Sequence, residues 1–149
     1  MKSATRVAIS TIGVYAGLLG AVHGYFETLQ GNVAPSGIAI KAIGPPCQAD
    51  KVWHACLPAI TLVPNFLVAG ILAIIISLTI VVWAAAFIQR KNGGLILILL
   101  SILMFLVGGG FIPFFTGIIA GVAGTRIKAP MAFSRTRLSG TALSFLAQL

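Results

Sequence analysis

The sequence predicts an all-α integral membrane protein, a bundle of four transmembrane helices whose last two form a tight hairpin. Of its 149 residues, 58% are hydrophobic and only 8% are charged, whereas about 25% of the residues of a soluble domain are charged. Three long windows contain no Lys, Arg, Asp or Glu. This composition excludes a soluble globular enzyme, a disordered chain and an ordinary nucleic-acid-binding protein.

The first window, residues 7–26, predicts one membrane-spanning helix. It has 20 residues, which matches the about 20 apolar residues that cross a bilayer core of ~30 Å. A secretory signal has a shorter apolar core, of about 7–15 residues, and an A-x-A cleavage site. Neither feature is present in this window, so we expect the helix to be retained rather than cleaved.

Residues 27–57 predict an outer loop that is braced by a disulfide bond. Gly and Pro residues throughout the loop are typical of turns, and apolar alternation over residues 33–43 predicts either a short strand or an interfacial helix. Cys47 and Cys56, the two cysteines of the chain, are separated by eight residues. Cysteines in one loop of an oxidising outer compartment usually pair. The alternative is a metal site that includes His54.

The second window, residues 52–89, predicts a helix only in its later part, residues 65–88. Pro58 and Pro64 punctuate the beginning of the window, and a proline is well tolerated only in the first turn of a helix. The predicted helix is about 36 Å long. That length allows one crossing with some tilt.

The third window, residues 92–125, predicts a helical hairpin rather than one helix. As one helix it would be about 51 Å long, which is too long for a single crossing. Three glycines and a proline within Gly108–Pro113 break it near its centre. The two arms are then residues 93–108 and 113–127. Both arms are short, so we expect local bilayer thinning or shielding by protein.

The distribution of charge predicts that both termini lie on the cytoplasmic side of the plasma membrane, because basic loops face the cytoplasm. With four crossings, two basic and two acidic residues lie outside: Lys41, Lys51, Glu27 and Asp50. With three crossings, four further basic residues would lie outside. With four crossings, the cytoplasmic side holds eight basic residues and no acid: Lys2, Arg6, Arg90, Lys91, Arg126, Lys128, Arg135 and Arg137.

The last segment, residues 129–149, predicts a cytoplasmic interfacial helix that follows a single membrane domain of residues 1–128. Its amphipathic part, residues 138–149, is too short to span a bilayer, and the arginines that precede this part favour anionic lipid headgroups. The alternative is a tail that is disordered or docked. Its apolar residues share one helical face: Leu138, Ala142, Phe145, Leu146 and Leu149.

Small residues at helical spacing predict smooth faces on the first and last helices. Such faces let two helix backbones approach closely. We expect them to pack either against other helices of the same chain or against another subunit. The glycines concerned are Gly13, Gly17, Gly20 and Gly24 in the first helix and Gly117 and Gly121 in the last.

Four polar side chains form a candidate ligand or cofactor site near the outer face: His23, Glu27, His54 and Asn65. His23 and Glu27 are four residues apart, so they lie on one face of the first helix. Ionisable groups at membrane depth indicate function. The simplest interpretation is a hydrogen-bonded pair at the membrane interface. The alternatives are a polar lining for a small-molecule cavity and ligation of a metal, haem or pigment by His23.

The sequence contains no catalytic pattern, so we expect a non-enzymatic protein without a metal or a cofactor. Two carboxylates leave few agents for acid–base chemistry. The serines and threonines of the spans, Ser77, Thr79, Ser101 and Thr116, are expected to bond back to their own helices.

The leading functional hypothesis is an accessory or scaffolding subunit of a larger membrane complex. Its partners would be the lipid bilayer and either other membrane subunits or further copies of the chain, without nucleic acid. One alternative is a protein that binds or transports a small molecule, a lipid or an ion at its outer face. Another is a cofactor-binding subunit of an electron-transfer or light-harvesting complex.

Overall fold

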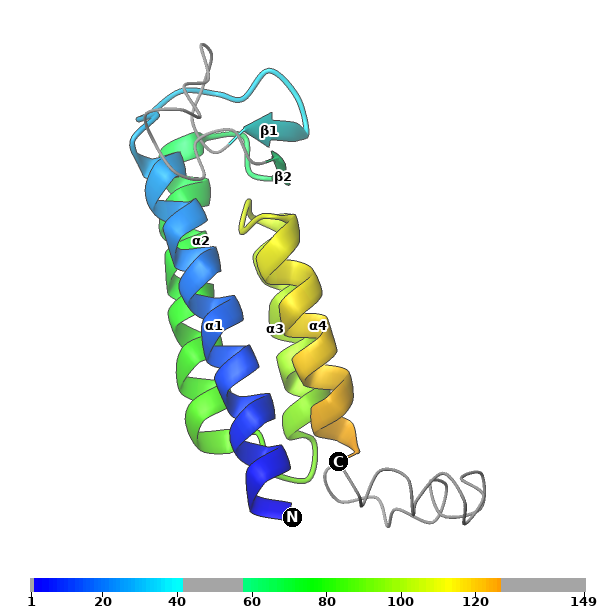
Figure 1. Cartoon of the computed structure of the whole chain (residues 1–149). Helices are drawn as coiled ribbons and strands as arrows, with labels where there is room; N and C mark the ends of the chain where they lie inside the picture. The colour runs from blue at the N-terminus through cyan, green and yellow to red at the C-terminus, as the bar shows by residue number, and fades with distance from the viewer. Residues whose placement is uncertain (1, 42–57, 127–149) are drawn as a thin grey trace, which may run out of the picture.

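The structure, a computed structural model, describes residues 2–41 and 58–126. This part of the chain is mostly helical, and it contains four helices and a short two-stranded ribbon (Figure 1). The elements in chain order are α1 (Lys2–Thr28), β1 (Ala39–Lys41), β2 (Pro58–Ile60), α2 (Phe66–Val82), its π-helical continuation η1 (Trp83–Phe87), α3 (Gly93–Leu106) and α4 (Phe111–Thr125).

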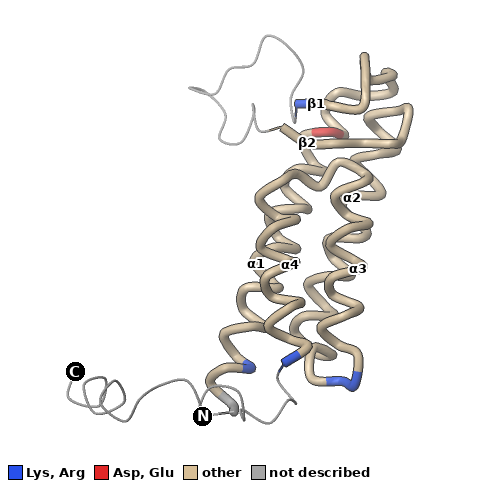
Figure 2. The backbone as a smooth tube through the Cα atoms, turned by 90° about the vertical axis from the view of Figure 1, so that its right-hand side faces the viewer, with Lys and Arg blue, Asp and Glu red and all other residues tan. Residues whose placement is uncertain are grey.

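The four helices run side by side, and the β1–β2 ribbon covers one end of them (Figure 1). We call this end the ribbon end and the opposite end, where the N-terminus lies, the terminal end. Helix α1 contacts both α2 and α4, and α3 packs on α4. Figure 2 shows that most Lys and Arg positions of the described chain lie at the terminal end, whereas the acidic position lies at the ribbon end together with Lys41 of β1.

Two helical segments are long and apolar enough to cross a membrane: Ala4–Thr28, with 25 residues, and Phe66–Phe87, with 22 residues. The third uncharged window contains two helices, as its length and its glycines predict. With 14 and 15 residues, α3 and α4 are each about 21–23 Å long. Pro113 lies in the first turn of α4, where a missing N–H leaves no helical hydrogen bond unmade.

The predicted outer loop contributes strand rather than helix in its described part. Ala39 pairs with Ile60 and Lys41 with Pro58 in antiparallel register. Of the two alternatives for residues 33–43, the structure therefore contains the short strand. The described fold is four helices with a small ribbon added at one end.

Helices α1 and α2 approach each other closely through glycines. A Cβ atom added to Gly24 would lie 2.7 Å from the carbonyl oxygen of Gly70, and one added to Gly70 would lie 2.5 Å from the carbonyl oxygen of Gly24. A Cβ atom on Gly17 would lie 2.7 Å from the carbonyl oxygen of Ser77. These contacts are close because each glycine lacks a side chain, so this face of α1 is occupied by the chain's own α2.

The smooth face of α4 is occupied in the same way, by α3. A Cβ atom on Gly121 would lie 2.5 Å from Cγ1 of Ile98, and one on Gly117 would contact the Ser101 hydroxyl. Gly13, in α1, faces Ala84 and Leu97. The glycine faces of the described helices therefore meet neighbouring helices of the same chain.

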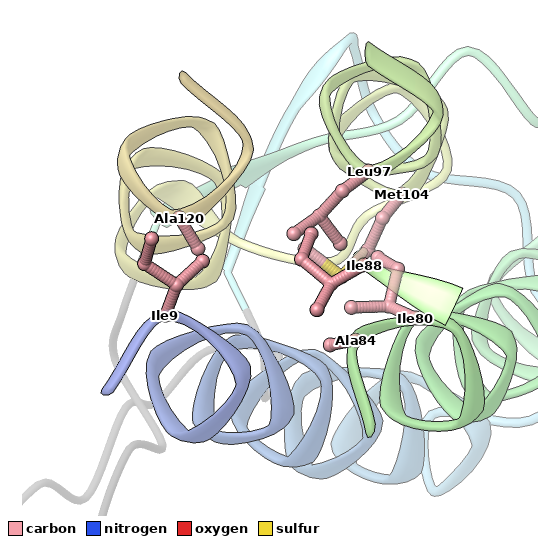
Figure 3. Packing of buried hydrophobic residues seen from close by; sticks show 7 residues of the cluster. All are labelled: Ile9, Ile80, Ala84, Ile88, Leu97, Met104 and Ala120. Carbon is pink, nitrogen blue, oxygen red and sulfur yellow. The ribbon is translucent and has the colours of Figure 1, made fainter. Parts of the chain in front are cut away.

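A buried apolar cluster fills the middle of the helices and extends toward the terminal end. Its side chains come from α1, α2, η1, α3 and α4 and from Ile88, which follows η1 (Figure 3). The buried members of this cluster are Ile9, Ile80, Ala84, Ile88, Leu97, Met104 and Ala120.

Aliphatic side chains also cover the outside of the helices; for example, Ile75 is 55% exposed and Ile119 is 61% exposed.

The junction of α2 and η1 is tied to its neighbours by two side-chain hydrogen bonds. The hydroxyl of Ser10 donates to the carbonyl oxygen of Ala84 at 2.7 Å. The indole N–H of Trp83 donates to the carbonyl oxygen of Gly93 at 3.0 Å. These bonds link η1 to α1 and to the beginning of α3, at the terminal end.

Asn65 caps the N-terminus of α2, because its side-chain oxygen accepts a hydrogen bond from the backbone N–H of Val68 at 3.1 Å. Replacing Asn65 by Ala is expected to lower the free energy of unfolding by about 1 kcal/mol, since it leaves a helix N–H without an acceptor. Unfolding in mild detergent, followed by helical circular dichroism, measures this loss. Asn65→Asp keeps the acceptor and should retain most of the stability; equal losses in the two variants would contradict the capping role.

Candidate functional site

His23 and Glu27 lie in the last two turns of α1, at the ribbon end, and both are buried. Glu27 is 0% exposed and His23 is 2% exposed. They share one face of the helix, as their spacing predicts. That face is turned inward, toward the connection between α3 and α4, so the pair belongs to the protein interior rather than to an exposed interface.

The connection between α3 and α4 is a three-glycine turn, residues 108–110, that covers this pair. Gly108 has φ of 104° and Gly110 has φ of 83°, which are backbone conformations that favour glycine. A Cβ atom on Gly108 would overlap both carboxyl oxygens of Glu27. A Cβ atom on Gly110 would lie 2.6 Å from Cε1 and Nε2 of the His23 ring. Each of the two ionisable side chains therefore contacts its own glycine of the turn.

Backbone hydrogen bonds hold the three-glycine turn in place. The N–H of Gly109 donates to the carbonyl oxygen of Met104 at 2.9 Å, and the N–H of Leu62 donates to the carbonyl oxygen of Leu106 at 2.9 Å. Thr61 forms an isolated antiparallel bridge with Val107. The turn is thus connected to the chain that leaves β2, and the ribbon and the turn together close the ribbon end.

The carboxyl group of Glu27 is buried without a hydrogen bond from the described residues. Neither of its oxygens accepts a hydrogen bond. Helices α2, α3 and α4 contain no charged residue and no histidine. An isolated carboxylate in an apolar interior costs far more free energy than a neutral polar group. The site therefore favours any small positive ligand that neutralises this carboxyl group.

A buried hydroxyl group, that of Ser77, lies one turn further inside. Ser77 is 0% exposed, and its hydroxyl group has no hydrogen-bond partner in the described chain. A Cβ atom on Gly20 would lie 2.5 Å from this hydroxyl and would also contact the sulfur of Met104. Ser77 therefore lies against α1 on the same inner side as His23 and Glu27.

Most other hydroxyl groups of the helices bond back to their own backbone, as the sequence predicts. Ser101 donates to the carbonyl oxygen of Leu97 at 2.8 Å. Thr79 and Thr116 make the corresponding bonds at 2.8 and 2.9 Å. Ser77 differs from these three residues, since its hydroxyl group makes no such bond.

The structure brings two of the four predicted site residues together. Asn65 is used as the cap of α2, so its side-chain oxygen is already engaged. His54 lies outside the described residues, as do Cys47 and Cys56, and the disulfide between those cysteines stays a prediction. Within residues 2–41 and 58–126, no group of three or more His, Cys, Asp or Glu side chains is arranged to hold a metal ion.

Sequence reasoning missed the residues that enclose the pair. The three glycines predict a turn, but nothing in their pattern says that the turn folds over α1. The one available signal was that Glu27, at the outer end of the first predicted span, and the three-glycine turn, at the outer end of the third, were predicted to lie at the same depth in the membrane.

The chain matches no protein-family model, no curated protein and no solved structure.

Proposed function

We propose that the protein is a small four-span membrane protein that binds a small cation, a class that includes the proton, at Glu27. The observation that carries this proposal is the complete burial of a carboxyl group that accepts no hydrogen bond in the described chain. A positive ligand offsets the cost of that buried charge. Of the functions that the sequence suggests, ion binding near the outer face has the most support from this geometry.

The membrane assignment is supported by the aliphatic outer surface and by the placement of charge. Large exposed apolar surfaces are rare on soluble proteins. Among the described residues, Arg6, Arg90, Lys91 and Arg126 are at the terminal end, whereas the ribbon end has Lys41 and Glu27 (Figure 2). The positive-inside rule then places the terminal end in the cytoplasm and the ribbon end outside.

This topology predicts the behaviour of a reporter fused after Leu149. A reporter that is active only in the cytoplasm should be active, and one that is active only outside should be silent, because an even number of crossings returns the chain to its starting side. Measuring both activities in intact cells checks this prediction. Activity of the outside reporter would mean an odd number of crossings and would contradict the four-span topology.

Cation binding is tested through its effect on folding. A ligand that binds only the folded state raises the free energy of unfolding as its concentration rises. We expect the wild-type protein in detergent to respond to at least one of H⁺, Na⁺, K⁺, Li⁺ or Mg²⁺, and Glu27→Gln to lose that response. The glutamine keeps the size of the side chain and removes its charge.

A matched control is Asp50→Asn, which removes the other acidic residue of the chain. This variant should keep the wild-type response. If wild type and Glu27→Gln respond identically to every cation in the series, the proposed function is wrong.

A role as an accessory subunit is the second candidate, and the lengths of α3 and α4 favour it. Helices of about 21–23 Å are shorter than the ~30 Å hydrocarbon core, so a neighbouring protein would shield their ends from lipid. The glycine faces do not add to this argument, because neighbouring helices of the same chain occupy them. Blue-native electrophoresis in mild detergent tests it: a larger complex supports a partner, and a monodisperse monomer contradicts it.

A further inference from the structure

We propose that the ligand of the Glu27 site is a proton, which the carboxyl group carries while the three-glycine turn is closed and exchanges with water at the ribbon end when the turn moves away. This inference rests on the proposed function and names its ligand. It is carried by three features of the site: its lack of space, its lack of further ligands and its closure toward the terminal end.

The lack of space follows from the contact between Glu27 and Gly108. The carboxyl oxygens lie so close to the Cα atom of Gly108 that even a methyl group there would overlap them. The ring of His23 is pressed against Gly110 in the same way. A proton needs no volume beyond that of the carboxyl group itself, whereas a metal cation must displace the turn.

The lack of further ligands also separates a proton from a metal ion. A hard cation such as Ca²⁺ or Mg²⁺ takes about six to eight oxygen ligands. Within the described residues no third His, Cys, Asp or Glu joins His23 and Glu27. One carboxyl group suffices to hold one proton, whereas a metal cation would have to take most of its ligands from hydroxyl groups, backbone carbonyls or water.

The ionisable groups that surround Glu27 are few. Helix α1 contributes His23, and β1 contributes the exposed Lys41. The turn, α2, α3, α4 and β2 contribute no ionisable side chain. The carboxylate charge therefore has no arginine or lysine packed against it in the described interior, and protonation is the available way to neutralise it.

The site is closed toward the terminal end by the apolar cluster of Figure 3. Beyond the buried Ser77 hydroxyl, the side chains of Ile80, Leu97 and Met104 are fully buried and offer no group that could pass a proton on. Exchange therefore takes place on the ribbon side. In the exchange step the O–H bond of Glu27 breaks, the proton passes to a water molecule, and the electron pair stays on the carboxylate oxygen.

The experiment compares the stability of wild type and Glu27→Gln in detergent, over a pH series at constant ionic strength and over a series of Na⁺, K⁺ and Li⁺ at constant pH. An unfolded glutamate loses its proton above about pH 4.3. If folded Glu27 keeps its proton, then the unfolding constant of wild type rises with pH relative to that of Glu27→Gln, by about tenfold per pH unit. Adding Na⁺, K⁺ or Li⁺ should leave the stability difference between wild type and Glu27→Gln unchanged.

Two background substitutions separate the contribution of Glu27 from those of its neighbours. The comparison is repeated with His23→Gln and with Lys41→Met in both proteins. Because the relevant proton is on Glu27, the pH-dependent difference should persist in both backgrounds. Its disappearance with either substitution would assign the proton to that neighbour and overturn the proposal.

The outcomes for the two proposals differ. If the stability difference between wild type and Glu27→Gln changes with the concentration of Na⁺, K⁺ or Li⁺ but not with pH, the proton proposal is overturned and the proposed cation site is kept. If that stability difference changes with neither, both proposals are overturned. If Glu27→Gln does not fold, labelling of wild type replaces it: an apolar carbodiimide, which reacts with protonated carboxyl groups, should modify Glu27 at neutral pH, and failure to do so would contradict the proposal.

Discussion

Replacing Gly108 by Ala is expected to destabilise the folded protein by about 2–6 kcal/mol. Two costs combine. Gly108 has φ of 104°, and a non-glycine residue in such a conformation costs about 1–3 kcal/mol. The added methyl group also overlaps the carboxyl oxygens of Glu27, and overpacking of a buried site costs about 1–3 kcal/mol. Denaturant unfolding in detergent measures the sum.

Another glycine of the chain separates the two costs. Gly31 has φ of 77°, and a Cβ atom there meets nothing within 4 Å, so Gly31→Ala measures the conformational cost alone. The double variant Gly108→Ala, Glu27→Ala removes the overlap and should lose only about as much stability as the sum of Gly31→Ala and Glu27→Ala. If Gly108→Ala costs no more than Gly31→Ala, then the turn does not press on Glu27.

Replacing Gly24 by Leu is expected to cost more than about 3 kcal/mol and to separate α1 from α2. The first atom of the new side chain would lie 2.7 Å from the carbonyl oxygen of Gly70 and 3.0 Å from Cβ of Ala73. Both neighbours are part of α2, and a backbone carbonyl cannot turn aside as a side chain can. Small residues at such crossings are what allows close backbone approach, and large insertions rank among the most destabilising substitutions.

A substitution on the exposed side of the same helix is the matched control. Thr11 is exposed on α1, so Thr11→Leu adds apolar volume without meeting another helix and should change stability by less than about 0.5 kcal/mol. Thermal unfolding followed by circular dichroism compares the two variants. Similar melting temperatures for Gly24→Leu and wild type would contradict the close contact of α1 with α2.

The elements of the fold that could be predicted from the sequence are those fixed by local chemistry. The uncharged windows predict where helices lie, and the glycines and Pro113 predict the break between α3 and α4. Pro64 predicts a helix that begins at residue 65, within one residue of the observed start of α2 at Phe66, because a proline is not tolerated in a helix interior. Where each helix begins and ends depends on residues that are close together in the chain, so the sequence alone can show it.

The contacts that build the candidate site could not be predicted, because they join distant parts of the chain. The spacing of His23 and Glu27 places them on one helix face, but the direction of that face depends on packing with other helices. The folding of Gly108 over Glu27 is likewise a tertiary contact. The same limit applies to the glycine faces: their spacing predicts close approach to a helix without saying whether that helix belongs to the same chain.

The most direct measurement of the buried carboxyl group uses the fact that Glu27 is the single glutamate of the chain. Protein labelled with ¹³C at the glutamate side-chain carboxyl, reconstituted in lipid vesicles, reports the protonation state of that one group by infrared difference spectroscopy against unlabelled protein. We expect the C=O stretch of a protonated, non-hydrogen-bonded carboxyl group at neutral pH, unchanged by Na⁺ or K⁺. The paired stretching bands of an ionised carboxylate at neutral pH would contradict a proton held at Glu27 beneath the three-glycine turn.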